Sequence, residues 1–168
     1  MTIAEQMSAL RDTLDPWANQ NGGKAFVASD MVHLWEIAWA KPDSPRVIIC
    51  YMGEDIRGDF SLAASLHRVD RQFSVMMTRG RGFNPDRGDS LTDQRGTARP
   101  LFDLVEEARE IIRAIIGISE ELPVDYKGVR TVQLGDQIID AYMIEFSCAT
   151  DLPGLSVTPD NPSPPASS

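Results

Sequence analysis

The chain has 168 residues, of which 42% are hydrophobic and 24% are charged, and its formal net charge is −9. This length is enough for one domain with a substantial core and short for two, so we expect a single domain. The negative charge argues against a surface that wraps nucleic acid, because affinity for phosphate depends on lysine and arginine. No apolar run is long enough to cross a bilayer, and the amphipathic, acidic start lacks the pattern of a signal peptide. We therefore expect no membrane association.

The first predicted element is a helix over residues 3–14. Its apolar residues recur at helical spacing, and Thr2 is suited to cap the first turn, with Gln6 nearby. Pro16 and the Asn-Gly-Gly run at 21–23 are expected to end the helix. The predicted apolar face consists of Ile3, Met7, Leu10 and Leu14.

Residues 26–39 fit both a helix and a strand. One face of a helix would carry Met31, Leu34, Trp35, Ala38 and Trp39, whereas alternate positions of a strand would carry Met31, Trp35, Ile37 and Trp39. The density of β-branched and aromatic residues favours the strand, with a connection following at 41–45.

Two further strands are predicted in the middle of the chain. Residues 46–52 form a continuous apolar run, which is typical of a central strand covered on both faces. Residues 68–79 alternate between apolar and polar, so we expect one dry and one wet face. The connection at 54–65 is predicted as a loop with room for a short helical turn at 62–66.

Residues 80–98 have no apolar period and are rich in Gly, Asp, Asn, Pro and Arg. Such a long structureless loop in a compact domain is usually a contact element or a segment that a partner orders. The surrounding stretch from Arg68 to Arg99 holds seven arginines and four aspartates, so it is basic while the rest of the chain is acidic. Charge separated in this way would allow copies of the chain to pair head to tail.

The clearest element is a helix over residues 100–116. Leucine, valine and isoleucine residues recur at positions i, i+3, i+4 and i+7, with acidic and basic residues between them. Pro100 suits the first helical position, acids lie near the positive N-terminal end, and Gly117 suits the end of the helix. A stripe this apolar requires a broad surface opposite it, which a sheet supplies.

The last predicted elements are a hairpin and a tail. Residues 126–134 and 138–148 read as two strands joined by a tight turn at Gly135-Asp136. Residues 154–168 are rich in Pro and Ser and are expected to be disordered in the free protein. The predicted fold is therefore α+β: a mixed, mostly antiparallel sheet packed against helix 100–116 and the N-terminal helix, in a domain spanning 1–153.

The residues predict no catalytic activity, metal site or cofactor. Recognisable phosphate-binding, nucleophile-elbow and zinc motifs do not occur in the sequence. His33 and His67 lie in separate segments and are read as ordinary structural histidines. Cys50 and Cys148 lie in apolar strand-like runs without metal-ligand spacing, so we expect buried reduced thiols.

The candidate interaction residues are charged residues of the loops and of strand 68–79. Arg-Gly-Asp occurs at 57–59 and 87–89, where chance accounts for it better than an adhesion function. The arginines either contact a partner or lie along the wet side of an edge strand with their charges in water. The candidates are Arg57, Asp59, Arg68, Arg71, Arg79, Arg81, Arg87, Asp89 and Arg95.

The order of the elements and several short phrases resemble the tail terminator, or tail completion, proteins of long-tailed bacteriophages. The phrases are VIICYMGE, RVDRQFSVMMTRGRG, RPLFDLVEEAREIIRAIIG, PVDYKGVRTV and DAYMIEFSCATDLP, and the resemblance spans residues 1–153. Related neck proteins that join head to tail share similar small α+β folds, so a different neck or tail-tube subunit is the alternative. A small-molecule-binding α+β domain is a third alternative, which would require a deep apolar pocket.

The resemblance implies a structural function in the virion, with assembly in the host cytoplasm. Subunits of this family assemble as a hexameric ring on the last ring of tail-tube protein, stop its polymerisation and present a surface to the head-tail connector or stopper protein. DNA would pass through the ring without sequence-specific binding, and an acidic lumen would let it slide. Heterologous contacts between subunits are what closes such a ring.

Overall fold

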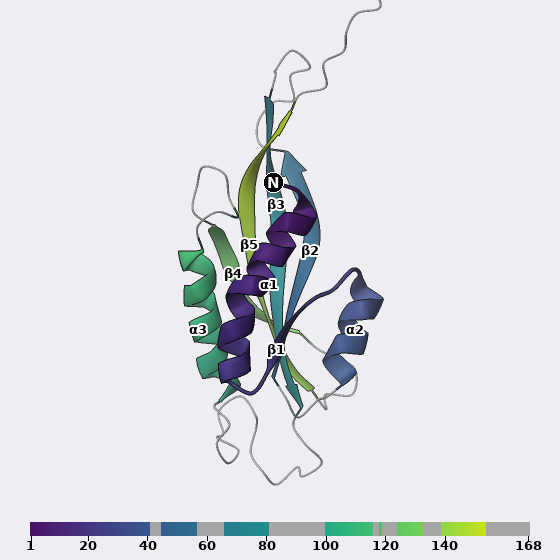
Figure 1. The fold of residues 1–168 in the computed structure, drawn as a ribbon, viewed down its shortest axis with the longest axis vertical. Coiled ribbons are helices and arrows are strands. Elements are labelled where there is room, and N and C mark those ends of the chain that lie inside the picture. The colour runs from purple at the N-terminus through teal and green to yellow at the C-terminus, as the bar shows by residue number, and fades with distance from the viewer. Residues whose placement is uncertain are drawn as a thin grey trace, which may run out of the picture.

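The computed structural model describes residues 1–40, 45–56, 66–80, 100–115, 118, 124–132 and 139–153. Within these residues the chain forms three helices and a five-stranded sheet with strand order β1-β2-β3-β5-β4 (Figure 1). One strand pair is parallel and the other three are antiparallel. The predicted α+β class with a mixed, mostly antiparallel sheet is confirmed.

Helix α1, Ile3–Gln20, is longer than the predicted 3–14. Thr2 caps it as expected, but the partner in the capping box is Glu5 rather than Gln6. The helix continues through Pro16 because tertiary contacts support its last turns: Ala18 is buried, and the Asp15 carboxylate accepts a hydrogen bond from the Ala25 amide at 2.9 Å. The chain then turns at Gly22, whose φ of +73° favours glycine.

The strand predicted at 26–39 is wrong for most of its length. Strand β1 is Lys24–Val27, and helix α2, Met31–Ala40, follows it. Strand β1 pairs in parallel with β2, Arg46–Ile56, so α2 is the crossover of a β-α-β unit. The alternative prediction of a helix in this segment is the correct one for Met31–Ala40, and Leu34 and Ala38 lie on its buried side.

The long strands of the sheet are β2, β3 and β5. Strand β3 is Leu66–Gly80 and strand β5 is Ile139–Pro153, and they pair antiparallel along their whole length. Strand β4, Asp125–Thr131, pairs with β5, which confirms the predicted hairpin. Helix α3, Leu101–Ala114, confirms the helix predicted at 100–116. Pro100 was expected to be its first residue but is the N-cap, one position before the helix begins.

Helices cover both faces of the sheet. On the α1/α3 face, helices α1 and α3 pack over Val75, Phe73 and Phe146 in the larger core. On the α2 face, helix α2 packs over Ile48, Met76 and Met143 in a smaller core. Residues 46–50 are accordingly buried on both sides, as predicted for a central strand.

The predicted wet face of strand 68–79 is wrong for half of its residues. Asp70, Gln72, Ser74 and Thr78 were expected to face water, and Asp70 and Gln72 are partly exposed, yet Ser74 and Thr78 are almost fully buried. Helix α2 covers this side of β3, which the misread segment 26–39 could not reveal. The polar alternation of β3 therefore marks the interior of the α2 face.

Some predictions fall outside the described residues. These are the helical turn predicted at 62–66 apart from Leu66, which begins β3, nearly all of the loop at 80–98, Gly117, the turn at 135–136 and the tail at 154–168 that was expected to be disordered.

Candidate functional site

Six of the nine candidate residues lie outside the described residues. They are Arg57, Asp59, Arg81, Arg87, Asp89 and Arg95, and their role in contacts stays a prediction. The other three, Arg68, Arg71 and Arg79, lie on β3, where the structure gives each a definite environment.

Arg68 forms an ion pair across the sheet. It lies directly opposite Asp151 of β5, and its Nε is 3.0 Å from the Asp151 Oδ1 atom. Both side chains are partly exposed, at 35% and 23%. Arg68 thus keeps a surface position near one end of the sheet, with its charge balanced by a neighbour.

Arg71 belongs to a buried hydrogen-bond network that holds the start of the chain. Its Nη1 donates to the main-chain oxygen of Met1 and to Oε1 of Gln6, both at 2.8 Å. Gln6 is fully buried, and its Nε2 donates to the main-chain oxygen of Ile118 and to Oγ1 of Thr150. This network joins α1, β3, β5 and the segment after α3, because each buried polar group needs a partner.

Arg79 is also buried, with 3% of its surface exposed. Arg71 and Arg79 were selected because strand 68–79 was expected to present them at a wet edge. The expectation is wrong for this strand, which lies between β2 and β5 and is covered by helices on both faces. Neither side chain offers an exposed contact surface.

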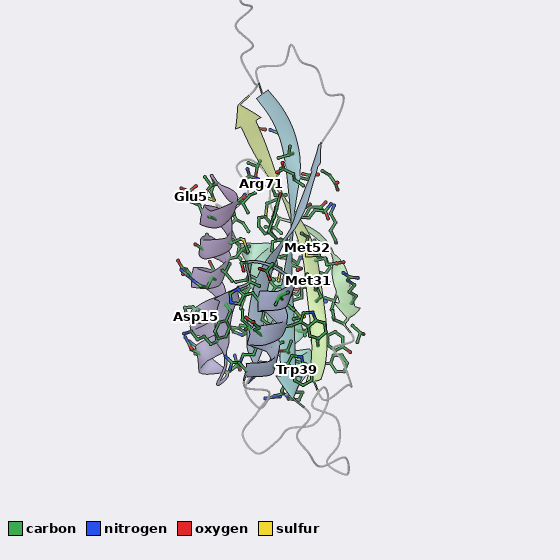
Figure 2. All side chains as sticks on the ribbon, turned by 90° about the vertical axis from the view of Figure 1, so that its right-hand side faces the viewer. Glu5, Asp15, Met31, Trp39, Met52 and Arg71 are labelled. Atoms are coloured by element: carbon green, nitrogen blue, oxygen red, sulfur yellow. The ribbon has the colours of Figure 1, made fainter. Side chains whose placement is uncertain are left out.

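The outward side of α2 is the largest group of exposed apolar side chains on one described element. Met31, Val32 and Trp39 are 57%, 69% and 38% exposed, while Leu34, Ile37 and Ala38 hold the helix to the sheet. Figure 2 shows Met31 and Trp39 at the two ends of this helix, with Met52 of β2 above them. We call Met31, Val32 and Trp39 the α2 patch.

The N-terminus of α2 is fixed by its own first residues. Asp30 accepts a hydrogen bond from the His33 amide at 2.8 Å, which holds the pKa of this carboxyl below its usual range. The His33 ring accepts from the Ser29 amide through Nδ1 at 3.2 Å. His33 therefore acts in a local cap, as the structural interpretation predicted, and the patch that follows it is held in place.

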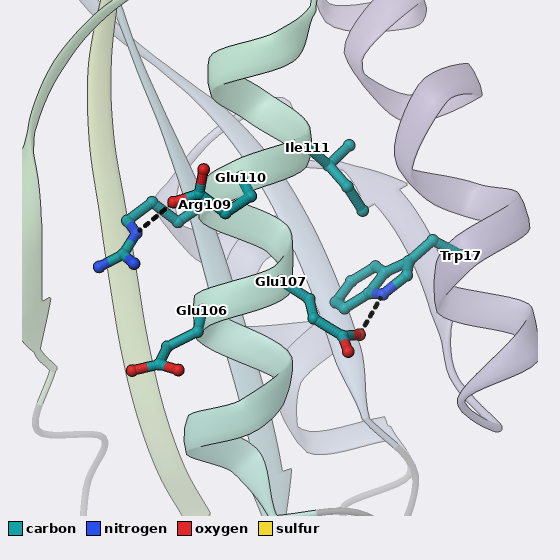
Figure 3. Close-up of a pocket in the computed structure, with 6 residues that line it drawn as sticks. All are labelled: Trp17, Glu106, Glu107, Arg109, Glu110 and Ile111. Atoms are coloured by element: carbon teal, nitrogen blue, oxygen red, sulfur yellow. Dashed lines mark hydrogen bonds and ion pairs between the residues drawn. The ribbon is translucent and has the colours of Figure 1, made fainter.

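A groove of about 470 Å³ lies between α1 and α3. Figure 3 shows Trp17 of α1 reaching towards Glu107 of α3, and the indole Nε1 donates to the Glu107 Oε2 atom at 3.0 Å. Ile111 adds an apolar wall, and Glu110 is paired with Arg109 at 3.3 Å. Trp17, Glu107 and Ile111 face one another across the groove, whereas Glu106, Arg109 and Glu110, which also line it, project from the side of α3 away from Trp17 (Figure 3).

A smaller hollow of about 280 Å³ lies on the sheet itself. Residues of β2, β3, β4 and β5 line it, among them Met52, Gln72, Lys127 and Glu145. Its charged groups are engaged locally: Lys127 pairs with Asp125 at 2.6 Å and Glu145 with Arg130 at 2.8 Å. This arrangement forms a polar surface rather than a reactive centre.

Both cysteines are buried free thiols, as predicted. Cys50 lies in the core of the α2 face and Cys148 in the core of the α1/α3 face, so the sheet separates them. Burial raises the pKa of Cys50 to about 11 and that of Cys148 to about 12. At neutral pH both are protonated and poorly nucleophilic.

No protein-family model matches the chain, and no curated protein sequence matches it. Within the described ranges, His, Cys, Asp and Glu do not gather in any group that could hold a metal ion. No helix in those same ranges has the length and apolar character to span a membrane.

Sequence reasoning missed both the α2 patch and the groove. A signal for the patch was present, because Asp30 precedes Met31, Trp35 and Trp39 at i, i+4 and i+8 spacing, which is a capped helix with an aromatic edge. The groove had no comparable signal. Trp17 and Glu107 are 90 residues apart, and only the packing of α1 beside α3 brings them together.

Proposed function

We propose that this chain is a non-catalytic subunit of the ring that ends a bacteriophage tail tube and provides the head-tail joining surface. The observation that carries the proposal is the α2 patch. The outer side of α2 carries Val32 and Trp39 together with the exposed Glu36, so it joins apolar surface to one charged group. Exposed apolar side chains rimmed by polar ones are a feature of protein-protein contacts.

The resemblance to tail terminators adds support from the sequence. Its most specific phrases, RQFSV and YMIEFSCATDLP, lie on β3 and β5, which are adjacent strands at the centre of the sheet. Phe73 and Phe146, one from each phrase, are register partners whose rings stack with centroids 5.9 Å apart. The two phrases therefore lie together in one packed unit of the sheet.

Under this proposal the partners are other copies of the chain, the tail-tube protein and the head-tail connector. A net charge of −9 suits a ring whose channel passes DNA without holding it, because few cations are available to bind phosphate. The rigid sheet, covered by helices on both faces, supplies a body that keeps its shape when neighbours pack against it.

The test is to delete the gene from its phage and to complement it with the wild-type chain or with Val32→Ser/Trp39→Ser. We expect the deletion and the double variant to give tails of abnormal length that lack heads, as seen by electron microscopy. Val32→Ser alters an exposed side chain and should cost about 0.5 kcal/mol or less, whereas Trp39 is 38% exposed, so its replacement costs more. Circular dichroism and urea denaturation check that the double variant is folded before its tails are scored.

Phe102→Ser is the matched control, because Phe102 is 39% exposed, close to Trp39, but packs on Tyr142 of β5. It should complement the deletion. Normal tails with joined heads in the deletion phage would refute the proposal. Purified protein that polymerises into tubes, instead of discrete rings, would identify a tail-tube subunit.

A further inference from the structure

We infer that Asn21 is a site of spontaneous deamidation, and that the reaction proceeds when the last turn of α1 opens. Asn21 is the C-cap of α1, and Gly22 follows it where the chain turns into β1, at the lower end of the molecule in Figure 1. Because glycine has no side chain, its main-chain nitrogen can approach the asparagine side chain without obstruction. The inference does not depend on the proposed ring.

Among the asparagines of the chain, Asn21 is the one best suited to this reaction. The sequence has asparagine at positions 19, 21, 84 and 161. Proline follows Asn84 and Asn161, and a proline nitrogen has no hydrogen to lose. Gln20 follows Asn19, and its side chain hinders the approach that glycine leaves open.

The reaction needs only the chain, a base and water. The main-chain nitrogen of Gly22 forms a bond to Cγ of Asn21, and the bond from Cγ to Nδ2 breaks as ammonia leaves with the proton that the nitrogen gives up. The product is a cyclic imide. Water then adds to one or the other ring carbonyl and opens the ring, which gives aspartate or isoaspartate at this position. No electrons are gained or lost by the chain.

The closed turn keeps the reacting atoms apart. Ring closure requires the Gly22 nitrogen to face Cγ of Asn21, whereas the Asn21 ψ of 18° turns this nitrogen away from the side chain. The Gly22 amide donates instead to the main-chain oxygen of Asn19 at 3.1 Å. The Asn21 Nδ2 atom donates to the main-chain oxygen of Trp17 at 3.0 Å. Both reacting groups are therefore held in other hydrogen bonds until the turn opens.

Contacts around the turn control how often it opens. The Gly23 amide donates to the main-chain oxygen of Ala18 at 2.9 Å, and a Cβ at Gly23 would meet the main-chain oxygen of Pro45. The Asp15 Oδ1 atom accepts from the Ala25 amide at 2.9 Å, which ties the segment after the turn back to α1. Opening at the end of a helix is local and needs less free energy than unfolding of the whole chain. Asp15 therefore guards the reaction from outside the reacting pair.

Deamidation would weaken the turn that delays it. Aspartate at position 21 exchanges the Nδ2 donor for a carboxylate oxygen that faces the main-chain oxygen of Trp17. It also adds negative charge at the end of α1, where the helix dipole is already negative. Isoaspartate further lengthens the main chain just before Gly23, which is closely packed on Pro45. Because Trp17 lines the groove between α1 and α3, we expect the modified chain to loosen this side of the groove.

The experiment follows the deamidation of the full chain by peptide mass spectrometry during incubation in mildly alkaline buffer. Four samples are compared: the folded wild type, the wild type in guanidinium chloride, and the folded variants Asp15→Ala and Asp12→Ala. Asp15→Ala removes the acceptor of the Ala25 amide. Asp12→Ala is the matched control on the same helix, because Asp12 is 66% exposed and pairs with the adjacent Arg11. Circular dichroism confirms that each variant is folded.

We expect Asn21 to deamidate several-fold more slowly in the folded wild type than in guanidinium chloride. Asp15→Ala should accelerate the reaction several-fold in the folded chain, whereas Asp12→Ala should keep the wild-type rate. Asn19 is the internal control, because it is exposed in the same turn and donates to Asp15 at 3.0 Å. It should stay intact over the same interval, even in Asp15→Ala. Labelling by an isoaspartyl methyltransferase identifies the isoaspartate product.

The effect of the product is measured with Asn21→Asp, which reproduces the aspartate form. Gln20→Glu is its control, since it adds the same charge to the exposed neighbouring residue. We expect Asn21→Asp to unfold at a lower urea concentration than Gln20→Glu. Equal midpoints would show that the Asn21 side chain does not hold the turn closed, and would contradict the inference.

Three further results would overturn it. Equal rates in the folded and unfolded wild type would show that the turn does not control the reaction. An intact Asn21 in both the folded wild type and Asp15→Ala, after a time that modifies the unfolded chain, would show that the turn does not open. Equal acceleration by Asp15→Ala and Asp12→Ala would reject the role of the hydrogen bond to Ala25. None of these results bears on the terminator proposal, which the phage test decides.

Discussion

The two faces of the sheet are covered to different degrees. Helices α1 and α3 close the α1/α3 face so fully that even Gln6 and Arg71 are buried there in a connected network. Helix α2 covers only part of the other face, and Met31 and Val32 are exposed on its outer side. The first face resembles the finished core of a monomer, and the second resembles half of an interface.

The difference separates residues that maintain the fold from residues that are available for contacts. Charge did not distinguish these two groups of residues, because Arg71 and Arg79, two of the three arginines of β3, belong to the interior. Exposed apolar side chains distinguish these groups better, since Met31 and Val32 are more than half exposed on α2 while Arg71 and Arg79 are buried.

The largest effect is expected for Arg79→Glu on the α1/α3 face. Arg79 is 3% exposed, so the substitution places a carboxylate in a closed interior and should cost more than about 4 kcal/mol of unfolding free energy or prevent folding. Urea denaturation followed by circular dichroism measures the loss. Arg68→Glu is the control on the same strand, where the side chain is 35% exposed. A stable Arg79→Glu variant would show that this face is less closed than we describe.

A moderate effect is expected for the network around Arg71. Arg71→Met leaves Oε1 of Gln6 without its donor, and Gln6→Met leaves Oγ1 of Thr150 and the oxygen of Ile118 without theirs. Each substitution should cost about 2–3 kcal/mol, because buried polar groups lose their partners.

The double variant Gln6→Met/Arg71→Met sharpens this test. Its cost should be about 1 kcal/mol less than the sum of the two single costs, since the shared hydrogen bond is lost only once. Strictly additive losses would mean that the two side chains act independently and that no network holds the start of α1.

The smallest effect is expected for the pH dependence of stability, which we compare for one buried thiol in each core. Burial raises the pKa of Cys50 and Cys148 from 9.0, so the folded state keeps them protonated where the unfolded state ionises. Their contribution is complete below pH 9 and is lost as the pH rises towards 11 and 12. Each thiol should therefore account for roughly 1–2 kcal/mol of lost stability by about pH 10.5.

Urea denaturation between pH 8 and 10.5 measures this slope in the wild type, Cys50→Ala and Cys148→Ala. The slope, rather than the absolute stability, is compared, because alanine also leaves a small cavity. We expect both variants to flatten the slope. A Cys50→Ala variant with the wild-type slope would show that water reaches the core beneath α2. The two cores would then differ in how well they exclude water, as well as in how much of each sheet face the helices cover.

Elements with an unambiguous local pattern could be predicted from the sequence. Helix α3 has one apolar stripe and signals at its start, and the first part of β2, residues 46–52, is a short apolar run of the kind that central strands require. The loop predicted from residue 54 is wrong for 54–56, where β2 continues by pairing with β3. The hairpin of β4 and β5 also follows from local alternation. In each case the residues that decide the structure are neighbours in the chain.

Features that depend on distant packing could not be predicted. Trp35 and Trp39 fit both periods, and the choice depends on whether Leu34 and Ala38 find a sheet to pack on. The burial of Ser74 and Thr78 depends on the same helix, so one misread segment produced both errors. The groove at Trp17 required the relative positions of α1 and α3, which no local pattern contains.

The fully buried amide of Gln6 has a consequence for how the protein is made. Its partners are Arg71, Ile118 and Thr150, so they leave the ribosome one after another, and the last of them comes more than 140 positions after Gln6 itself. Helix α1 is synthesised well before β5, yet its inner side cannot be completed until β5 has been translated. Folding of the α1/α3 face is therefore delayed until β5 is made, and during that interval its apolar surfaces are open to chaperones and to neighbouring nascent chains.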